Sequence, residues 1–348
     1  MRVLMVAERL PPAIGGVERH MTGLVPSLAS HGITLTLVAP KHDPRLPDED
    51  SLADARVFRM PTRAGRARYP AAWRWWMDHR HLLLDADIIH FHGVYSLLHW
   101  TGPSLALSSH RPRFMTYHGY EMRIPVQRRA RLYHDMAERL TRGSLCIGHF
   151  LVRWLGIHPT VVTYGACTAP ELVPAAPEAH SAAFVGRLAP DTGLDIYLRG
   201  LGLLRNHHGI DIPLTVCGDG PWRATLEQLA RDEGIRATFH GFIPDPGPII
   251  ESSTLVLTSG YLSMLETMVR RRPLFTVYHN PVKEDYLKLM PQASELFLTA
   301  PDPATFADQA LRVIAQGPSA QMLEQAHCFA AAHTWEALAQ HYLLLWGA

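Results

Sequence analysis

Short apolar runs alternate with longer amphipathic segments along the whole chain, and this alternation predicts parallel sheets flanked by helices. The first half is expected to form a helix over about Val17 to Ser30 and strands at Val3–Ala7, Thr34–Ala39, Ile88–His92 and Phe114–His118. In the second half the expected strands are Ala182–Val185, Leu214–Cys217, Thr238–Phe239, Leu255–Thr258 and Leu274–Tyr278. The two series predict two doubly wound α/β lobes. Because ligands of such sheets bind beyond the carboxyl ends of the strands, we expect a ligand in a cleft between the lobes.

The boundary between the lobes is predicted at residues 169–181, a segment rich in Pro, Ala and Glu that lacks periodicity. This gives an N-terminal domain over 1–168, a C-terminal domain over 182–331 and a final helical segment over 332–348. The total of 348 residues suits about two domains. Four widely spaced cysteines predict no disulfide framework, and no apolar run approaches the roughly 20 residues that span a bilayer. A cytoplasmic protein is expected.

The formal net charge of +1 conceals an asymmetry between the two halves. Residues 1–168 carry 21 Lys and Arg against 13 Asp and Glu, whereas residues 169–348 carry 12 against 19. The halves are therefore charged +8 and −7. Only three of the basic residues are lysines, namely Lys41, Lys283 and Lys288.

In the first half, candidate chemistry follows the predicted strand ends. Gly15 and Gly16 lie directly before the first helix, where free N–H groups attract phosphate, although a simple turn explains them equally well. His92 and His118 end two neighbouring strands, and His118 is the candidate for hydrogen-bonding a substrate. His90 and His92 share a strand face, but no third ligand is arranged nearby in the sequence, so we expect no metal site.

In the second half, Arg187 follows a strand end, where a guanidinium can hold a diphosphate. The alternative for Arg187 is a surface ion pair. Gly218 and Gly220 permit close approach of a base or phosphate, or else form a tight turn. Glu266 is the single acid on an apolar helix, which suggests that it binds ribose hydroxyls or pairs with a nearby arginine.

Taken in order, the motifs resemble the family 4 retaining glycosyltransferases of the GT-B fold, which has two Rossmann-like lobes. They are the Gly-Gly loop, HFHG, YHGYE, YGA at 164–166, FVGRL, GDGP, FHGF and LETM followed by RRP. The resemblance covers essentially the whole chain, including a final helix of the type that crosses back to the first lobe. It implies sugar transfer from a nucleotide diphosphate sugar with retention of configuration, with no metal and no cofactor besides the donor substrate.

The resemblance also implies roles for individual residues. Gly16, beside Gly15, would touch the donor phosphate, and Arg187 would hold the diphosphate. Gly218 with the backbone of Phe242 and Ile243 would border the base, and Glu266, the second Glu of an E-x7-E motif, would bind the ribose. His118 would contact the donor sugar, and His92 and Glu121 are candidates on the acceptor side. Catalysis would rest on His118, Arg187 and Glu266, with donors at the departing diphosphate as the main contribution.

The sequence departs from the family pattern at three positions. Thr192 replaces the lysine that usually accompanies the arginine, Thr258 replaces the first Glu of E-x7-E, and Arg271 replaces a glycine. Lys283 is a candidate substitute for the missing phosphate cation. The backbone of Gly260, Tyr261 and Leu262 is expected to present N–H groups to the donor.

The acceptor side is indicated by two arginine-rich segments in the first half. Residues 63–84 combine five arginines with Trp73, Trp75 and Trp76, and residues 123–142 form a second basic stretch. Arg with Trp suits an anionic membrane surface, which predicts a peripheral membrane protein and a lipid-linked or glycan acceptor. The alternative is a solvated helix whose tryptophans are buried in the core. No nucleic-acid recognition motif accompanies the arginines, so nucleic acid is not expected as a partner.

Two other functions fit the same sequence. A nucleotide-sugar 2-epimerase can share this fold, and Thr192 and Thr258 suggest a catalytically silent scaffold subunit.

Overall fold

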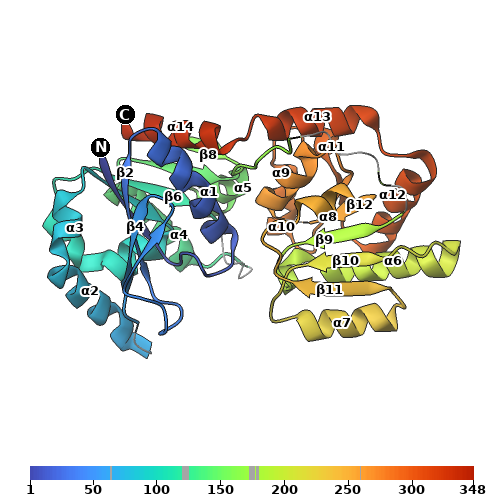
Figure 1. The fold of residues 1–348 in the computed structure, drawn as a ribbon, viewed down its shortest axis with the longest axis horizontal. Helices are drawn as coiled ribbons and strands as arrows, with labels where there is room; N and C mark the ends of the chain where they lie inside the picture. The colour runs from blue at the N-terminus through green and yellow to red at the C-terminus, as the bar shows by residue number, and fades with distance from the viewer. Residues whose placement is uncertain (63–64, 120–124, 172–176, 178–179, 259) are drawn as a thin grey trace. The chain divides into compact units, whose positions relative to one another are not determined.

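The computed structural model describes residues 1–62, 65–119, 125–171, 177, 180–258 and 260–348. The chain divides into two compact units (Figure 1). Unit 1 comprises Met1–Gly165 and Trp335–Ala348, and unit 2 comprises Ala166–Thr334. Among the described residues, none of the helices combines the length and the apolar character that a bilayer crossing needs.

Unit 1 is built on an eight-stranded sheet in the order β3-β4-β2-β1-β5-β6-β7-β8. All neighbouring strands are parallel except β3, which pairs antiparallel with β4. Strand β1 pairs with β2 on one side and with β5 on the other. The strands are β1 (Arg2–Ala7), β2 (Thr34–Pro40), β3 (Glu49–Leu52), β4 (Ala55–Met60), β5 (Ile88–His92), β6 (Arg113–Tyr117), β7 (Gly143–Ile147) and β8 (Val161–Thr163).

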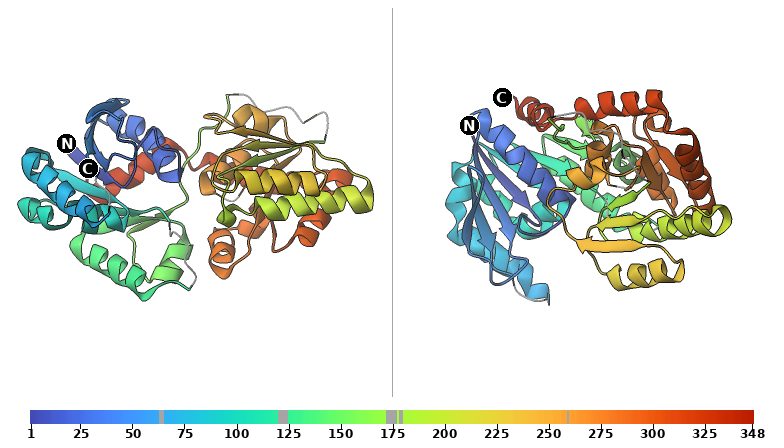
Figure 2. Two further views of the ribbon diagram at one scale, coloured as in Figure 1. Left: turned by 90° about the horizontal axis from the view of Figure 1, so that it is seen from below. Right: turned by 45° about the vertical axis from the view of Figure 1, so that its right-hand side comes forward.

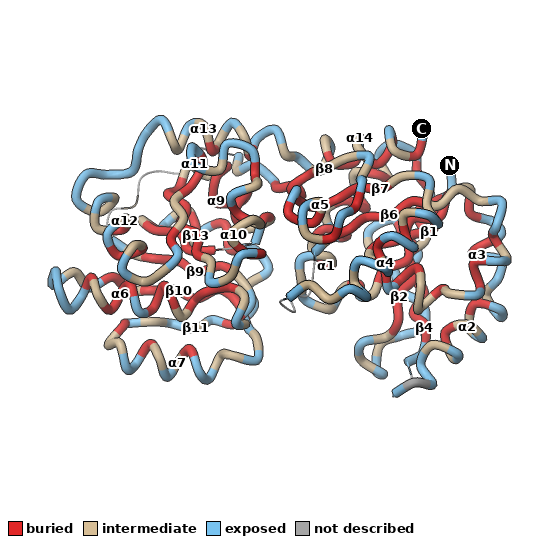
Figure 3. The backbone as a smooth tube through the Cα atoms, turned by 180° about the vertical axis from the view of Figure 1, so that it is seen from behind, coloured by how far each residue is buried: buried red, intermediate tan, exposed pale blue. Residues whose placement is uncertain are grey.

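Strands β1, β2, β4, β5, β6 and β7 are mostly buried, which is why they form near-continuous apolar runs, whereas the edge strand β3 is exposed (Figure 3). The α-helices of unit 1 are α1 (Gly16–Ser30), α2 (Arg68–Asp78), α3 (Arg80–Asp85), α4 (Arg128–Leu140), α5 (His149–Leu155) and α14 (Trp335–Trp346). Short helical turns lie at η1 (Gly65–Ala67), η2 (Ser96–Thr101) and η3 (Gly102–Ser108).

The C-terminal helix α14 packs against α1 within unit 1 (Figures 1 and 2). Its buried residues follow helical spacing along one face: Leu338, Ala339, Tyr342, Leu343 and Trp346. A Cβ atom on Gly23 of α1 would overlap the indole of Trp335. Glycine at this position therefore makes room for the first residue of α14.

Unit 2 is built on a six-stranded parallel sheet in the order β11-β10-β9-β12-β13-β14. The strands are β9 (Ala182–Val185), β10 (Leu214–Cys217), β11 (Ala237–Gly241), β12 (Leu255–Leu257), β13 (Leu274–Val277) and β14 (Leu298–Ala300). Its helices are η4 (Pro190–Thr192), α6 (Leu194–His208), α7 (Arg223–Asp232), α8 (Gly247–Glu251), α9 (Tyr261–Val269), α10 (Pro281–Lys288), α11 (Ala293–Leu296), α12 (Pro303–Gln316) and α13 (Ala320–Ala331). The chain runs outward from β9 through β10 to β11 and then returns to β12 on the other side of β9. This reversal makes β9 and β12 the switch point at which ligands of such sheets bind.

Candidate functional site

The carboxyl ends of β9, β10 and β11 in unit 2 are joined by main-chain hydrogen bonds. Gly186 N–H donates to the carbonyl of Cys217 (3.1 Å), and Gly218 N–H donates to that of Gly241 (2.7 Å). A Cβ atom on Gly218 would overlap the carbonyl oxygen of Gly186, and one on Gly220 would overlap that of Leu188. These two glycines are thus needed by the backbone packing of the loops themselves.

Arg187 follows β9 and lies on the surface. Its side chain is 63% exposed and forms an ion pair with Asp191 at 3.0 Å. Thr192, which closes the η4 turn, donates its hydroxyl proton to the carbonyl of Ala189 (2.7 Å). The surface ion pair proposed as the alternative for Arg187 is therefore present, although such a pair is weak and can be exchanged for a diphosphate.

Lys283 lies in the first turn of α10, which follows β13, and its side chain is buried. Its Nζ atom lies 3.9 Å from the ring centroid of Tyr286. Burial lowers the pKa of Lys283 to about 7, while the charge of Asp191 raises it and that of Arg187 lowers it. These interactions show that Lys283, Asp191 and Arg187 share one electrostatic environment near the switch point.

Tyr286 of α10 also closes the start of α9. The rings of Tyr261 and Tyr286 are stacked, with centroids 3.9 Å apart and planes 9° from parallel. Tyr261 N–H donates to the hydroxyl of Tyr286 (2.8 Å), and Tyr261 Oη donates to the carbonyl of Tyr286 (2.5 Å). One of the N–H groups expected to face a donor phosphate therefore has an internal partner.

Thr258 lies at the end of β12 and is fully buried. Its hydroxyl donates to the carbonyl of Val185 (2.7 Å) at the end of β9, and its Oγ1 lies 2.6 Å from Oγ of Ser263 in α9. At the position where the resemblance implies a carboxylate, this chain therefore has a hydroxyl, which hydrogen-bonds to the end of β9 and lies next to a hydroxyl of α9.

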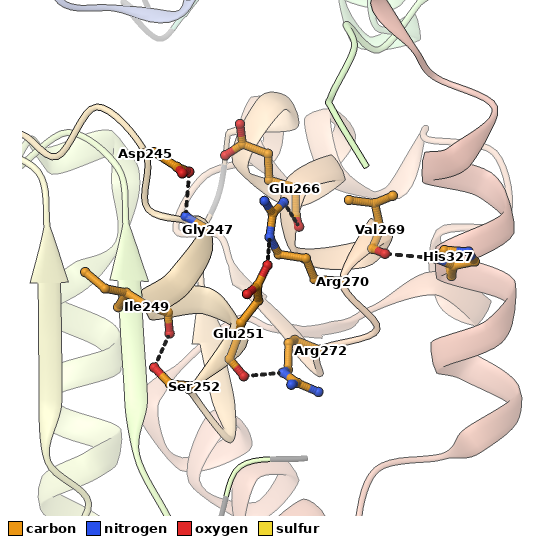
Figure 4. A network of polar contacts seen from close by, with 10 residues as sticks. All are labelled: Asp245, Gly247, Ile249, Glu251, Ser252, Glu266, Val269, Arg270, Arg272 and His327. Carbon is orange, nitrogen blue, oxygen red and sulfur yellow. Dashed lines mark hydrogen bonds and ion pairs between the residues drawn. The ribbon is translucent and has the colours of Figure 1, made fainter. Parts of the chain in front are cut away.

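Glu266 lies in α9, and its side chain is buried (Figure 4). The nearby Arg270 donates to the main-chain carbonyl of Glu266 (3.1 Å) and to the carboxylate of Glu251 (3.0 Å). In Figure 4 the carboxylate of Glu266 points away from Arg270. Arg270 thus pairs with the carboxylate of Glu251.

The end of β11 presents an aromatic side chain to solvent. Phe242 is exposed, whereas Ile243 packs on a small buried cluster that includes Val185 and Cys217. An exposed ring next to the Gly218 loop is suited to stacking on a flat base.

Unit 1 contains a buried cluster of histidines. His92 Nδ1 lies 2.8 Å from His118 Nε2. The rings of His20 and His118 pack edge-on, with their centroids 4.7 Å apart. One nitrogen of each of these three histidines lies within 4.8 Å of the others. Burial lowers the pKa of His20 to about 3 and those of His92 and His118 well below their usual value, with smaller contributions from the neighbouring imidazoles. All three are therefore neutral at physiological pH.

The loop before α1 leads into this cluster. Gly16 is the first residue of α1, and no described atom lies within 4 Å of the position that a Cβ atom would take there. There is therefore space beside Gly16, whereas the buried Glu18 carboxylate lies against Gly15 in the same first turn. His20 lies one turn further along the same helix.

Comparison with known proteins decides the family. A model described as Glycosyltransferase Family 4 matches residues 14–152, and a model described as Glycosyl transferases group 1 matches residues 179–316. The chain is a family 4-like glycosyltransferase. Over 100 residues it is 35% identical to the alpha-D-kanosaminyltransferase of Streptomyces kanamyceticus, a match that spans only 26% of each chain.

Solved structures resemble this glycosyltransferase over nearly its full length. A sucrose-phosphate synthase from Thermosynechococcus elongatus matches with a TM-score of 0.77 and 18% identity, covering 99% of this chain and 98% of the other. An E. coli protein described as trehalose-6-phosphate bound with UDP-2-fluoro glucose matches with a TM-score of 0.70 and 12% identity, covering 99% and 98%. At these identities the likeness shows the fold, which is GT-B with two α/β sheets.

The structure places the predicted site residues of the glycosyltransferase in two groups. In unit 2, residues that carry the predicted donor site follow β9, β12 and β13 at the carboxyl edge of one sheet: Arg187, Thr192, Gly260, Tyr261, Leu262, Glu266 and Lys283. In unit 1, Gly15 and Gly16 open α1, and His92 contacts His118. Glu121 lies outside the described residues.

The tryptophans of the first arginine-rich segment differ in burial. Trp76 is fully buried, so the interfacial interpretation is wrong for this residue. Trp73 and Trp75 are half-buried: Trp73 donates its indole N–H to the carbonyl of His99 (2.9 Å), and Trp75 stacks on His79. For these two residues the interfacial interpretation stays a prediction.

Sequence analysis missed three residues that pack with the candidate site residues or with one another: His20, Tyr286 and Tyr342. The expectation that no third ligand lies near His90 and His92 is wrong for His92, because His20 of α1 and His118 place a nitrogen within 4.8 Å of one of its own. The spacing of four between Gly16 and His20 on one predicted helix is the signal that could have linked them. Nothing in the sequence near Tyr286 or Tyr342 indicates a partner so distant along the chain.

Proposed function

We propose that this glycosyltransferase moves a sugar from a nucleotide diphosphate sugar, UDP- or GDP-linked, to a glycan or lipid-linked acceptor with retention of configuration and without a metal. The observation that carries the proposal is that cationic side chains and a buried carboxylate follow strands at the carboxyl edge of the unit 2 sheet. Arg187 and Lys283 share an electrostatic environment there, and α9 holds the buried Glu266.

The chemistry follows from charge. Breaking the anomeric bond leaves negative charge on the departing diphosphate and makes the sugar oxocarbenium-like. Arg187 and Lys283 would stabilise the diphosphate, and Glu266 would accept hydrogen bonds from the ribose hydroxyls. Lys283 thereby takes the role of the lysine that Thr192 replaces, since the Thr192 hydroxyl is bonded to Ala189.

Replacing Arg187 with alanine should weaken nucleotide diphosphate binding by about tenfold, because one charge-assisted hydrogen bond to the diphosphate is lost. Calorimetric titration with UDP, GDP and ADP measures the effect. Arg236→Ala is the matched control, because Arg236 is 65% exposed and pairs with Asp211 at 2.8 Å but precedes β11 at the opposite edge of the sheet. Equal losses in both variants would contradict the placement of the donor site.

Transfer itself is tested by incubating the enzyme with sugar nucleotides and lipid-linked acceptors and analysing the products. A new glycoside is expected. A free epimerised sugar nucleotide would instead identify a 2-epimerase, and no thermal stabilisation by any of the nucleotides would identify a silent scaffold subunit.

We further propose that unit 1 meets an anionic membrane surface through α4. Leu132, Met136 and Leu140 are 55%, 41% and 39% exposed and lie one turn apart along one face of this helix. Exposed arginines accompany them: Arg128, Arg129, Arg131 and Arg139. An exposed apolar stripe flanked by arginines suits the headgroup region of a bilayer, where a lipid-linked acceptor would be found.

Vesicles that contain phosphatidylglycerol should therefore float the wild-type protein at low salt, and a Leu132→Ser/Met136→Ser variant should bind several-fold less. Leu344→Ser is the control, because Leu344 is the most exposed leucine of α14 and lies outside this stripe. If the α4 variant floats as well as the wild type, α4 is not the contact surface.

A further inference from the structure

A chain of buried polar groups in unit 1 connects the C-terminal helix to His20. Trp346 Nε1 lies 3.0 Å from His90 Nδ1, and His90 Nε2 lies 2.7 Å from Thr116 Oγ1. Thr116 Oγ1 lies 2.8 Å from Tyr342 Oη, which lies 2.9 Å from His20 Nε2. All five side chains are buried, so these hydrogen bonds do not compete with solvent.

The indole of Trp346 sets the direction of this chain, because an indole N–H can only donate. His90 Nδ1 must therefore accept. Burial, with a smaller contribution from His20, lowers the pKa of His90 to about 3, so His90 is neutral and carries its proton on Nε2, which donates to Thr116.

The remaining two bonds follow. The Thr116 hydroxyl donates a hydrogen bond to Tyr342 Oη, and the Tyr342 hydroxyl donates one to His20 Nε2. His20, which is also neutral, therefore carries its proton on Nδ1.

The opposite direction of these hydrogen bonds would leave one buried donor without an acceptor. If His20 Nε2 donated to Tyr342, the Tyr342 proton would point to Thr116. The Thr116 hydroxyl, which is fully buried, would then have no acceptor among the described residues. Buried donors without acceptors are strongly disfavoured.

We propose that Trp346 fixes His20 as the Nδ1–H tautomer, so that His20 is a hydrogen-bond donor toward a substrate oxygen at the cluster with His92 and His118. That the oxygen is a hydroxyl or phosphate oxygen of the transferase substrates rests on the proposed function, whereas the tautomer does not. A further buried group, His92 Nε2, has no partner in the described part of the chain and adds a second contact for such a ligand.

The same logic disfavours a metal ion at this cluster. Ligation through His20 Nδ1 needs a lone pair there, which moves the proton to Nε2 and reverses the chain. The reversed hydrogen bonds leave the buried Thr116 hydroxyl without an acceptor among the described residues, as above. If Thr116 instead donated to His90 Nε2, the His90 proton would move to Nδ1 and face the indole N–H of Trp346, 3.0 Å away. Trp346 in this way makes His20 a donor to an oxygen acceptor at this cluster.

The test is NMR of the full chain with 15N-labelled histidine, using His20→Asn and His90→Asn variants for assignment. We expect wild-type His20 to show a protonated Nδ1 and His90 a protonated Nε2. Trp346→Phe keeps an aromatic ring but removes the donor, so His20 should change to a mixture of tautomers. Trp335→Phe is the matched control: Trp335 also lies on α14 near the His20 ring but outside the chain, and this variant should leave His20 unchanged.

Three results would overturn the proposal: a protonated Nε2 on wild-type His20, an unchanged His20 tautomer in a folded Trp346→Phe variant, or stoichiometric Zn2+ binding that is lost in His20→Asn. None of these measurements needs a sugar donor, so failure of the tautomer assignment is separate from failure of the transferase function. The substrate contact is tested by turnover, where His20→Asn, which keeps an N–H near the Nδ1 position, should retain several-fold more activity than His20→Leu.

Discussion

The substitution Gly218→Ala should destabilise unit 2 by about 3 kcal/mol and abolish nucleotide binding. The new Cβ atom would overlap the carbonyl oxygen of Gly186, which belongs to the main chain and cannot rotate away as a side chain would. Relief requires the loops after β9 and β10 to separate, which breaks the bond from Gly186 N–H to the carbonyl of Cys217. Urea unfolding followed by circular dichroism measures the change in the free energy of unfolding.

Gly260→Ala is the matched control for this prediction. Gly260 lies in the same unit and also follows a strand at the carboxyl edge, but a Cβ atom there would have Ser263 Oγ as its nearest neighbour at an ordinary 3.6 Å. Its unfolding should match that of the wild type within about 0.5 kcal/mol. If Gly218→Ala unfolds at the same free energy as Gly260→Ala and the wild type, the loops after β9 and β10 tolerate a side chain and the prediction is wrong.

Several of the strands that the sequence analysis missed lack a long buried run, although β4 and β7, which are mostly buried, were missed as well. Strand β3, Glu49–Leu52, is almost wholly polar and exposed, and β8 and β14 have three residues each. Such strands are specified by pairing with a neighbour already in the sheet, which periodicity along one segment cannot reveal. The order of the strongly apolar strands was nevertheless enough to predict two doubly wound sheets.

Candidate site residues could be picked out from the sequence where a charged or hydrogen-bonding residue follows the end of a predicted strand. Arg187, Glu266 and His118 follow strands, so their placement near a carboxyl edge could be argued from sequence. By contrast, the contact of His20 with Tyr342 joins residues 322 positions apart, and the stacking of Tyr261 on Tyr286 depends on how α9 and α10 pack. The proton direction in unit 1 needs both the complete chain of hydrogen bonds and its distances.

The second large effect that we expect is a pH dependence of nucleotide binding caused by Lys283. In the free protein its pKa is lowered to about 7, chiefly by burial, so its ammonium is protonated below pH 7 and largely neutral well above it. A diphosphate favours the charged form and raises the pKa, so binding takes up a proton when the pH exceeds about 7. Affinity for UDP or GDP should therefore be highest below pH 7 and fall as the pH rises toward 9.

The stability of the free protein should change in the opposite sense. Between pH 7 and the ordinary lysine value of 10.5, the unfolded chain holds the Lys283 proton and the folded protein does not. The contribution of Lys283 to the free energy of unfolding therefore rises with pH across this window. Lys283 thus predicts weaker nucleotide binding together with a larger contribution to the free energy of unfolding at alkaline pH. General alkaline unfolding would instead lower both binding and stability.

The contribution of Lys283 to nucleotide binding is isolated by titrating three variants, two of Lys283 and one of Lys288, from pH 6 to 9. Lys283→Met should bind nucleotide diphosphate about 10²-fold more weakly at pH 6 and lose the pH dependence, because one buried cation at the diphosphate is gone. Lys283→Arg should keep more of the affinity with a flatter profile, since a guanidinium stays charged throughout. Lys288→Met is the control, because Lys288 is exposed and pairs with Glu284 at 2.6 Å. If Lys283→Met keeps the wild-type profile, Lys283 does not bind the phosphate and the cation that Thr192 replaces has no substitute on α10.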